Sequence, residues 1–178
     1  MRVRFGFSSG AFSNSEREFI VHTLNHKSGW VRDGHSFVLV QNHEPRDVVL
    51  HLQDRKEMRK RFPQRYLRNL SVTDMRKKPF HIHIDYKNWK NIPESFEGPM
   101  ERYRQYLIQH EMGHVLGHDH RRAPPKFLNP QQKCNVMMQQ TKGTRNRCKS
   151  NPWHLGDSSN SPPPTAGGVP KQQIFGCP

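Results

Sequence analysis

The sequence contains no long hydrophobic run. Only 32% of its 178 residues are hydrophobic, and the mean hydropathy is −0.98. Because a membrane-spanning helix needs about 18 or more consecutive apolar residues, we expect no transmembrane segment. Residues 1–10 include arginines but no continuous apolar stretch, so no signal peptide is expected. These absences leave the compartment open and slightly favour an intracellular or particle-associated protein over a secreted one.

Cysteine is also scarce. The chain has three cysteines, and none of them belongs to a Cys-x-x-Cys pair, which argues against a structural zinc knuckle. Cys134 and Cys148 flank a polar loop, and a disulfide between them requires an oxidising compartment. A disulfide and two free thiols therefore both remain open for this pair, and Cys177 is left over near the C-terminus.

Acidic residues are few beside basic ones, at 15 against 29, which gives a formal charge of +14. The excess is concentrated between Arg55 and Lys78, where ten basic residues accompany two acidic ones. Such a surface favours a polyanion: nucleic acid, an anionic membrane surface or an acidic protein. The alternative is a solvated basic face that keeps the protein soluble.

Several catalytic arrangements are missing from the sequence. It shows no carboxylate pair of the glycosidase kind, no Ser-His-Asp set, no glycine-rich phosphate loop and no internal repeat. A chain of this length has room for one domain with a single modest core.

The most informative stretch begins at His110 and reads H-E-x-x-H-x-x-G-x-x-H. On a helix, His110 and His114 project from one face toward a single ion. Glu111 lies beside that ion, where it can take a proton from a zinc-bound water. Gly117 can adopt a positive φ and end the helix, so that His120 returns as the third ligand. Three protein ligands leave a fourth position for water, as in catalytic Zn²⁺ sites.

Two interpretations without catalysis also fit the same stretch. It also fits a histidine-rich surface helix or a metal site without catalysis. We expect His118 to face solvent or support a ligand rather than bind the ion. Asp119 is expected to be a solvated turn residue, with a hydrogen bond to a ligand imidazole as the alternative.

Caps and β-branched runs predict the order of the other elements. A capping box at Ser13 and Glu16 starts a helix that runs through about His26. Residues 54–62 suggest a short exposed helix. The predicted strands are 3–7, 36–41 and 48–52, followed by a hairpin with arms 70–75 and 80–86.

The second hairpin arm alternates apolar and polar residues. Phe80, Ile82 and Ile84 should face the core, so His81, His83 and Asp85 should face water. A position beside a substrate cleft is the alternative. Metal binding by the two histidines would require a second ion, which nothing else in the sequence indicates.

The ligand helix is predicted to span residues 99–116, with Pro99 at its first position. Residues 1–155 should form the folded domain. Residues 156–178 are rich in Ser, Pro and Gly and are expected to be a disordered or partner-dependent tail, within which Ile174 and Phe175 are candidates for docking.

The zinc string is the signature of the metzincin metalloproteases, and the sequence resembles a metzincin-like domain of unknown function found in actinobacterial exported proteins. The resemblance spans roughly residues 13–153. Besides 110–120, it rests on Trp30, Asp85-Tyr86, Trp89, the segments 103–106 and 136–143, Cys148 and Asn151-Pro152-Trp153.

This resemblance implies a small α+β metzincin-like (zincin) domain: a twisted mixed sheet backed by an N-terminal helix and the active-site helix. It also implies a methionine turn beneath the three histidines. Met137 matches that position best, with Met138 as the fallback, and an ordinary buried methionine is the alternative. Gln139 and Gln140 follow where some metzincins have a tyrosine that assists in the transition state.

The sequence therefore predicts a zinc metalloendopeptidase that binds one catalytic Zn²⁺ and uses Glu111 as general base on a peptide or protein substrate. The main alternative is a basic protein that binds nucleic acid or a particle and carries a catalytically idle metzincin-like domain. Zinc-dependent hydrolysis of a substrate other than a peptide is a third interpretation.

Overall fold

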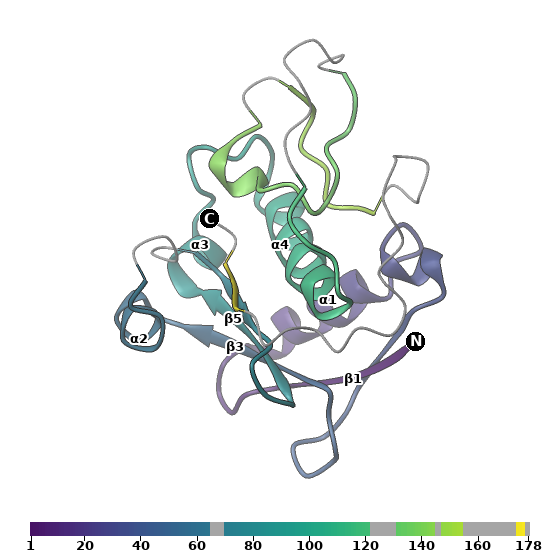
Figure 1. Cartoon of the computed structure of the whole chain (residues 1–178), viewed down its shortest axis with the longest axis vertical. Helices are drawn as coiled ribbons and strands as arrows, with labels where there is room; N and C mark the ends of the chain where they lie inside the picture. Colours follow the sequence, from purple (N-terminus) through teal and green to yellow (C-terminus); the bar gives the residue numbers. More distant parts are fainter. Residues whose placement is uncertain (65–69, 122–130, 145–146, 155–173, 177–178) are drawn as a thin grey trace.

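The computed structural model describes residues 1–64, 70–121, 131–144, 147–154 and 174–176. They form a small α+β domain in which helices pack on a mixed sheet (Figure 1). The predicted α+β class with a mixed sheet is therefore confirmed.

The sheet has six strands in the order β2-β1-β3-β5-β4-β6. The strands are β1 Arg2–Phe7, β2 Ser36–Leu39, β3 Val48–Gln53, β4 Val72–Asp74, β5 Phe80–Asp85 and β6 Ile174–Gly176. Strands β2, β1, β3 and β5 run parallel to one another, whereas β4 runs antiparallel to β5 and β6. The predicted hairpin is the pair β4–β5, and each predicted strand lies within two residues of its expected bounds at both ends.

Most of the predicted tail lies outside the described residues, as does Cys177. The three tail residues that are described form β6, which pairs with β4 so that Phe175 lies opposite Thr73.

Within the described residues, four α-helices and two 3₁₀ turns accompany the sheet. They are α1 Asn14–Leu24, η1 Trp30–Asp33, α2 Arg55–Arg61, α3 Tyr86–Lys90, α4 Met100–Val115 and η3 Gln140–Lys142. Within the described residues, no helix has the length and apolar content to cross a membrane. Helix α3 was not predicted, because its cap Asp85 is also the last residue of a strand pattern.

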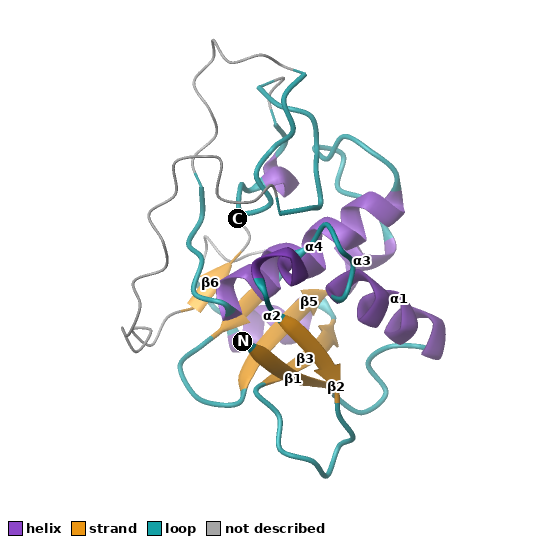
Figure 2. Ribbon diagram, turned by 90° about the vertical axis from the view of Figure 1, so that its right-hand side faces the viewer, coloured by secondary structure: helices purple, strands orange, loops and turns teal. Residues whose placement is uncertain are grey.

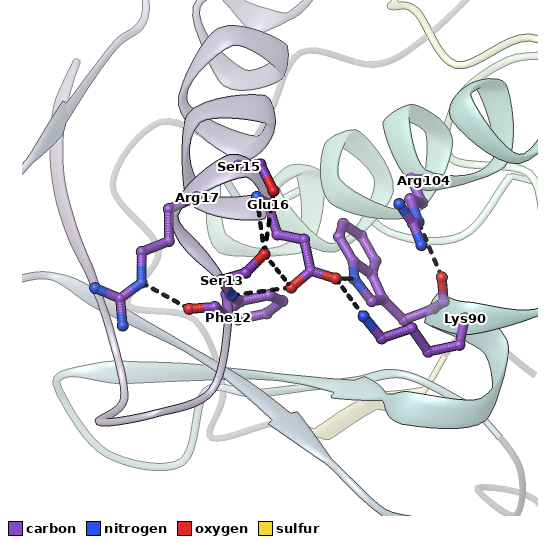
Figure 3. A network of polar contacts seen from close by, with 8 residues as sticks. Phe12, Ser13, Ser15, Glu16, Arg17, Lys90 and Arg104 are labelled. Atoms are coloured by element: carbon purple, nitrogen blue, oxygen red, sulfur yellow. Dashed lines mark hydrogen bonds and ion pairs between the residues drawn. The ribbon is translucent and has the colours of Figure 1, made fainter.

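Helix α1 begins with the predicted capping box (Figure 3). The carboxylate of Glu16 accepts hydrogen bonds from the Ser13 backbone at 2.9 Å, from Nε1 of Trp89 at 2.8 Å and from Nζ of Lys90 at 2.6 Å. Burial raises the pKa of Glu16, but these bonds outweigh it and lower the pKa to about 2. Glu16 thus ties α1 to α3. The helix ends at Leu24, two residues before the predicted end.

One face of the sheet packs against α1 and α4 (Figure 2). The main core contains Leu50 and Ile82 from the strands, Ile20 from α1 and Leu107 from α4. Helix α4 is fixed to its surroundings by polar contacts as well, since Nε2 of Gln109 donates to a carbonyl of α1 at 2.5 Å. The ligand helix is therefore held against both the sheet and α1.

The opposite face of the sheet is covered by α2 and the residue after it, Phe62. Met58 and Phe62 form a second small core with Val72 of β4. As a result His83 and Asp85 of β5 are fully buried. The expectation that they face water is wrong, because α2 packs over them.

Candidate metal centre

Helix α4 presents the predicted site residues from its last two turns. It spans Met100–Val115, one residue shorter at each end than predicted, with Pro99 as the cap residue. His110, Glu111 and His114 are each 0% exposed. Their burial places the two imidazoles and the carboxylate between the helix and its neighbours rather than on an open surface.

The end of α4 turns the chain back toward the helix. Gly117 has φ +91°, a backbone conformation that residues with a side chain rarely adopt. Its N–H donates to the carbonyl of His114 at 2.9 Å, and the next N–H, of His118, donates to the carbonyl of Gly113 at 2.9 Å. This pair of bonds is the Schellman motif. It reverses the chain direction at the position where the sequence predicts the turn.

The turn brings His120 beside the helix. Nε2 of His120 lies 3.1 Å from Nε2 of His114. The ring centroids of His110 and His120 are 5.2 Å apart, and those of His114 and His120 are 4.6 Å apart. One nitrogen from each ring lies within 4.8 Å of the other two. We call this group the helix triad.

Backbone carbonyls fix two of these rings. Nδ1 of His110 lies 2.8 Å from the carbonyl of Val136, and Nδ1 of His114 lies 2.8 Å from the carbonyl of His118. A carbonyl only accepts, so both Nδ1 atoms carry the hydrogen. The lone pair of each ring is therefore on Nε2. Nε2 of His110 is buried and has no hydrogen-bond partner within the described part of the chain.

The environment keeps the helix triad uncharged. Burial lowers the pKa of His114 to about 2, with His110 and His120 as further causes. Burial also lowers the pKa of His120 to about 4 and lowers that of His110. All three rings are consequently neutral near pH 7, which is the form that binds a metal ion.

Glu111 is held by a residue that the sequence interpretation missed. The hydroxyl of Thr73, on β4, donates to Oε2 of Glu111 at 2.5 Å and contacts the Glu111 backbone carbonyl at 3.3 Å. Only the pairing of β4 with β5 brings Thr73 to the helix, so no local pattern could have identified it. The carboxylate is thus oriented between α4 and the sheet.

Met137 lies directly against the ligand helix. It is buried in the main core. Gly113, between the two helical histidines, leaves the space for it, because a Cβ there would overlap Sδ of Met137 and lie 2.7 Å from Cζ2 of Trp30. Trp30 in turn donates to the backbone carbonyl of Gln109 at 2.8 Å. The requirement for glycine at 113 was also missed, since the zinc string leaves that position open.

Met138 belongs to a separate small core. It packs on the disulfide that joins Cys134 to Cys148 in the structure. The carbonyl of Met138 accepts from the Tyr106 hydroxyl of α4 at 3.0 Å. Of the two methionines, Met137 is therefore the one that packs on the ligand helix beside the histidines.

The residues around the triad take supporting positions. The Gln139 amide nitrogen lies 3.3 Å from Nδ1 of His120. The ring of His118 stacks on Trp30 at 4.5 Å, and its carbonyl orients His114. Asp119 is exposed and accepts from the backbone N–H of His120 at 3.1 Å. Neither His118 nor Asp119 joins the group of three imidazoles.

The basic stretch between Arg55 and Lys78 runs over α2 and the hairpin turn. Arg65 and Arg68 lie outside the described residues. The exposed basic residues of the stretch are Lys56, Arg59, Lys60, Arg61, Arg76, Lys77 and Lys78. The first four belong to α2, and Arg76 and Lys77 line one pocket together with Arg61. Lys78 instead lies over the Phe80 ring, at 5.7 Å from its centroid.

Comparison with known proteins places the chain in a family. The profile described as "Protein of unknown function (DUF3152)" matches residues 5–156, which is most of the chain. The chain belongs to this family. No curated protein matches it. The part matched by the DUF3152 profile includes the whole helix triad, Glu111, Thr73 and the Met137 turn.

Proposed function

We propose that this DUF3152 protein is a zinc-dependent peptidase of the metzincin type. The observation that carries the proposal is the helix triad: three neutral imidazoles with one nitrogen each within 4.8 Å, beside a buried carboxylate. The α+β fold with a mixed sheet and the position of Met137 against the ligand helix agree with it.

The donor set fits zinc. Imidazole nitrogen is one of the ligands that zinc prefers, and three protein ligands are the number found in catalytic sites. His110 and His114 each donate a hydrogen bond from Nδ1–H to a backbone carbonyl. Metal-binding histidines usually have this kind of support. His110, His114 and His120 would hold the ion. When bound, zinc supplies Lewis acidity that polarises a carbonyl and lowers the pKa of water to about 7.

Glu111 has the position of a general base. It lies next to His110 on α4, about 100° round the helix, and Thr73 fixes one of its oxygens. In peptide hydrolysis Glu111 would accept the proton of the attacking water and pass it to the leaving amine. An extended peptide would lie beside this carboxylate if it replaced β6 as the partner of β4.

The test combines metal content with hydrolysis on the purified full chain. Mass spectrometry measures zinc per chain, and a peptide library is digested with and without a chelator. We expect Glu111→Gln to retain zinc and to lower kcat by at least about 100-fold, because a general base contributes about 10²–10⁴.

Glu101→Gln is the matched control, since Glu101 is an exposed carboxylate on the same helix. It should leave both zinc content and turnover unchanged. Normal peptide hydrolysis by Glu111→Gln would refute the mechanism, and absence of zinc at the helix triad would refute the proposal as a whole.

A second candidate is a polyanion-binding protein with an idle metal site. It is favoured by the exposed basic residues of α2, including Lys56, Arg59 and Lys60. Salt-sensitive nucleic-acid binding that survives Glu111→Gln, together with zinc but no hydrolysis in the wild type, would favour this candidate.

A further inference from the structure

Three more histidines meet on the other face of the sheet. His51 lies on β3, and His81 and His83 lie two residues apart on β5. In the parallel register His51 is directly opposite His83. Alternate residues of a strand share a face, so all three rings are on the same side. One nitrogen from each lies within 4.8 Å of the other two. We call this group the sheet triad.

The sheet triad is remote from the helix triad. Its residues alternate with Ile82 and Leu50, which face α4 in the main core. The triad therefore faces α2, and the Phe62 ring contacts His83 edge-on at 5.1 Å. His83 is 0% exposed, whereas His51 and His81 are half-buried. The buried face of the sheet and Phe62 enclose one side of the triad, and solvent reaches the other.

One lone pair of the triad is buried without a partner. Nδ1 of His83 lies 2.6 Å from Oε1 of Gln53. Because an amide oxygen only accepts, Nδ1 carries the hydrogen and Nε2 carries the lone pair. Nε2 of His83 is buried and has no hydrogen-bond partner within the described part of the chain. A buried acceptor left in this state is costly unless something binds it.

The other two rings face each other closely. Nε2 of His51 lies 2.9 Å from Nδ1 of His81. Two nitrogens on one tetrahedral zinc are about 3.3 Å apart, from Zn–N bonds of about 2.05 Å. If a ring rotates slightly and the shared hydrogen moves to the other nitrogen of its ring, both lone pairs can therefore bind one ion. The helix triad shows the same kind of contact, at 3.1 Å between His114 and His120.

The charges around the sheet triad bear on what it can bind. Burial lowers the pKa of His51 to about 4 and that of His83 to about 2, with neighbouring histidines and Arg61 as further causes. Burial also lowers the pKa of His81. The three rings are thus neutral near pH 7. Arg61 and Arg46 oppose a cation, but Arg61 is exposed and Arg46 is only half-buried, so solvent screens part of their charge. Asp74 offsets part of their charge, although it pairs with Arg76 at 2.7 Å.

A pocket of about 460 Å³ reaches the triad at His81. Its lining residues are Arg61, Asp74, Arg76, Lys77 and His81. Three of the five carry positive charge. Water or a small anion can therefore reach an ion held by the three rings and complete its coordination.

We propose that His51, His81 and His83 form a second metal site, which takes an imidazole-preferring divalent ion such as Zn²⁺. The site holds the ion between β3 and β5 with three protein ligands. Its fourth position is open to the basic pocket. Gln53 is a positioning residue that fixes His83 with its lone pair on Nε2.

Zinc stoichiometry on the untagged full chain tests this second site. We expect two zinc ions per chain in the wild type and one in His51→Gln. His120→Ala, which removes a ligand of the helix triad, should also leave one. The combination of both changes should leave none. His43→Gln is the matched control, since His43 is exposed on a turn outside both triads, and it should still bind two.

The affinity for the second ion gives an independent reading. We expect Gln53→Leu to weaken it about 10–100-fold while Gln53→Glu retains it, because a carboxylate also accepts from Nδ1 of His83. Circular dichroism verifies that each variant is folded. One zinc per chain in the wild type with no loss in His51→Gln would overturn the proposal, as would unchanged affinity in Gln53→Leu. Neither result would alter the conclusion on the helix triad, which depends on His120→Ala.

Discussion

The two histidine triads differ in how the chain assembles them. The helix triad lies within eleven consecutive residues, and a helix, a Schellman turn and a short return bring its rings together. The sheet triad combines residues 30 positions apart along the chain. Its rings meet only because β3 and β5 pair in one register.

This difference explains why one triad was visible in the sequence and the other was not. Helix periodicity and the preference for glycine at a helix-ending turn depend only on neighbouring residues, so they can be applied to the eleven residues 110–120. The partner of a strand is chosen by the tertiary fold, and a slip of one residue would turn His51 to the opposite face. Two histidines on one strand are therefore uninformative until the neighbouring strand is known.

The largest expected effect concerns acid stability of the metal-free protein. His114 and His83, one from each triad, both have a pKa of about 2, below the usual value of 6.5, mainly because of burial. Above pH 6.5 folded and unfolded forms are both neutral. Below it only the unfolded chain takes up the proton, so stability falls by about 1.4 kcal/mol per pH unit for each residue.

Urea unfolding of chelator-treated protein between pH 7 and 5 measures this slope. His83→Gln and His114→Gln should each reduce it by about 1.4 kcal/mol per pH unit. Equal slopes in the wild type and in either variant would show that the corresponding ring is not kept neutral by the fold. Unequal changes would show which triad is the more strongly buried in solution.

The next effect concerns the packing at Gly113, which lies beside the helix triad and not beside the sheet triad. Alanine usually stabilises a helix relative to glycine by about 1 kcal/mol. At Gly113, however, the added Cβ would overlap Met137 and approach Trp30. We expect Gly113→Ala to destabilise the protein by about 1–3 kcal/mol and to weaken zinc binding at the helix triad alone.

A double-mutant cycle with Met137→Ala checks the cause. The combined variant should be more stable than the sum of the single changes implies, by about 0.5–3 kcal/mol. If Gly113→Ala is as stable as the wild type, Met137 does not pack as closely against Gly113 in solution as the structure shows.

The smallest effect concerns Thr73. Thr73→Val preserves shape but removes the hydroxyl that donates to Glu111. We expect kcat to fall about 10-fold, which is close to the lower end of the about 1.5–3 kcal/mol that a hydrogen bond to a charged group contributes. KM and the zinc content of both triads should not change. Thr73→Ser, which retains the hydroxyl, should restore most of the activity, and a Val variant with full activity would exclude a positioning role.

Much of the fold followed from local chemistry. The capping box at Ser13, the hairpin and the glycine turn at Gly117 were predicted, because each depends on a few neighbouring residues. Helix α3 was not predicted, since its N-cap residue Asp85 is also the last residue of β5. The burial of His83 and Asp85 was predicted wrongly, because alternation tells which residues share a face but not what covers that face.

By itself the sequence determined that His110, His114 and His120 meet beside Glu111, because helix periodicity and a glycine that can take a positive φ set their relative positions. Only a resemblance pointed to Met137, and the tertiary structure decided between it and Met138. Only the tertiary structure decided that Thr73 reaches Glu111 and that His51 joins His81 and His83. Those contacts depend on strand order and register, which arise from packing over the whole core. No short sequence pattern encodes them.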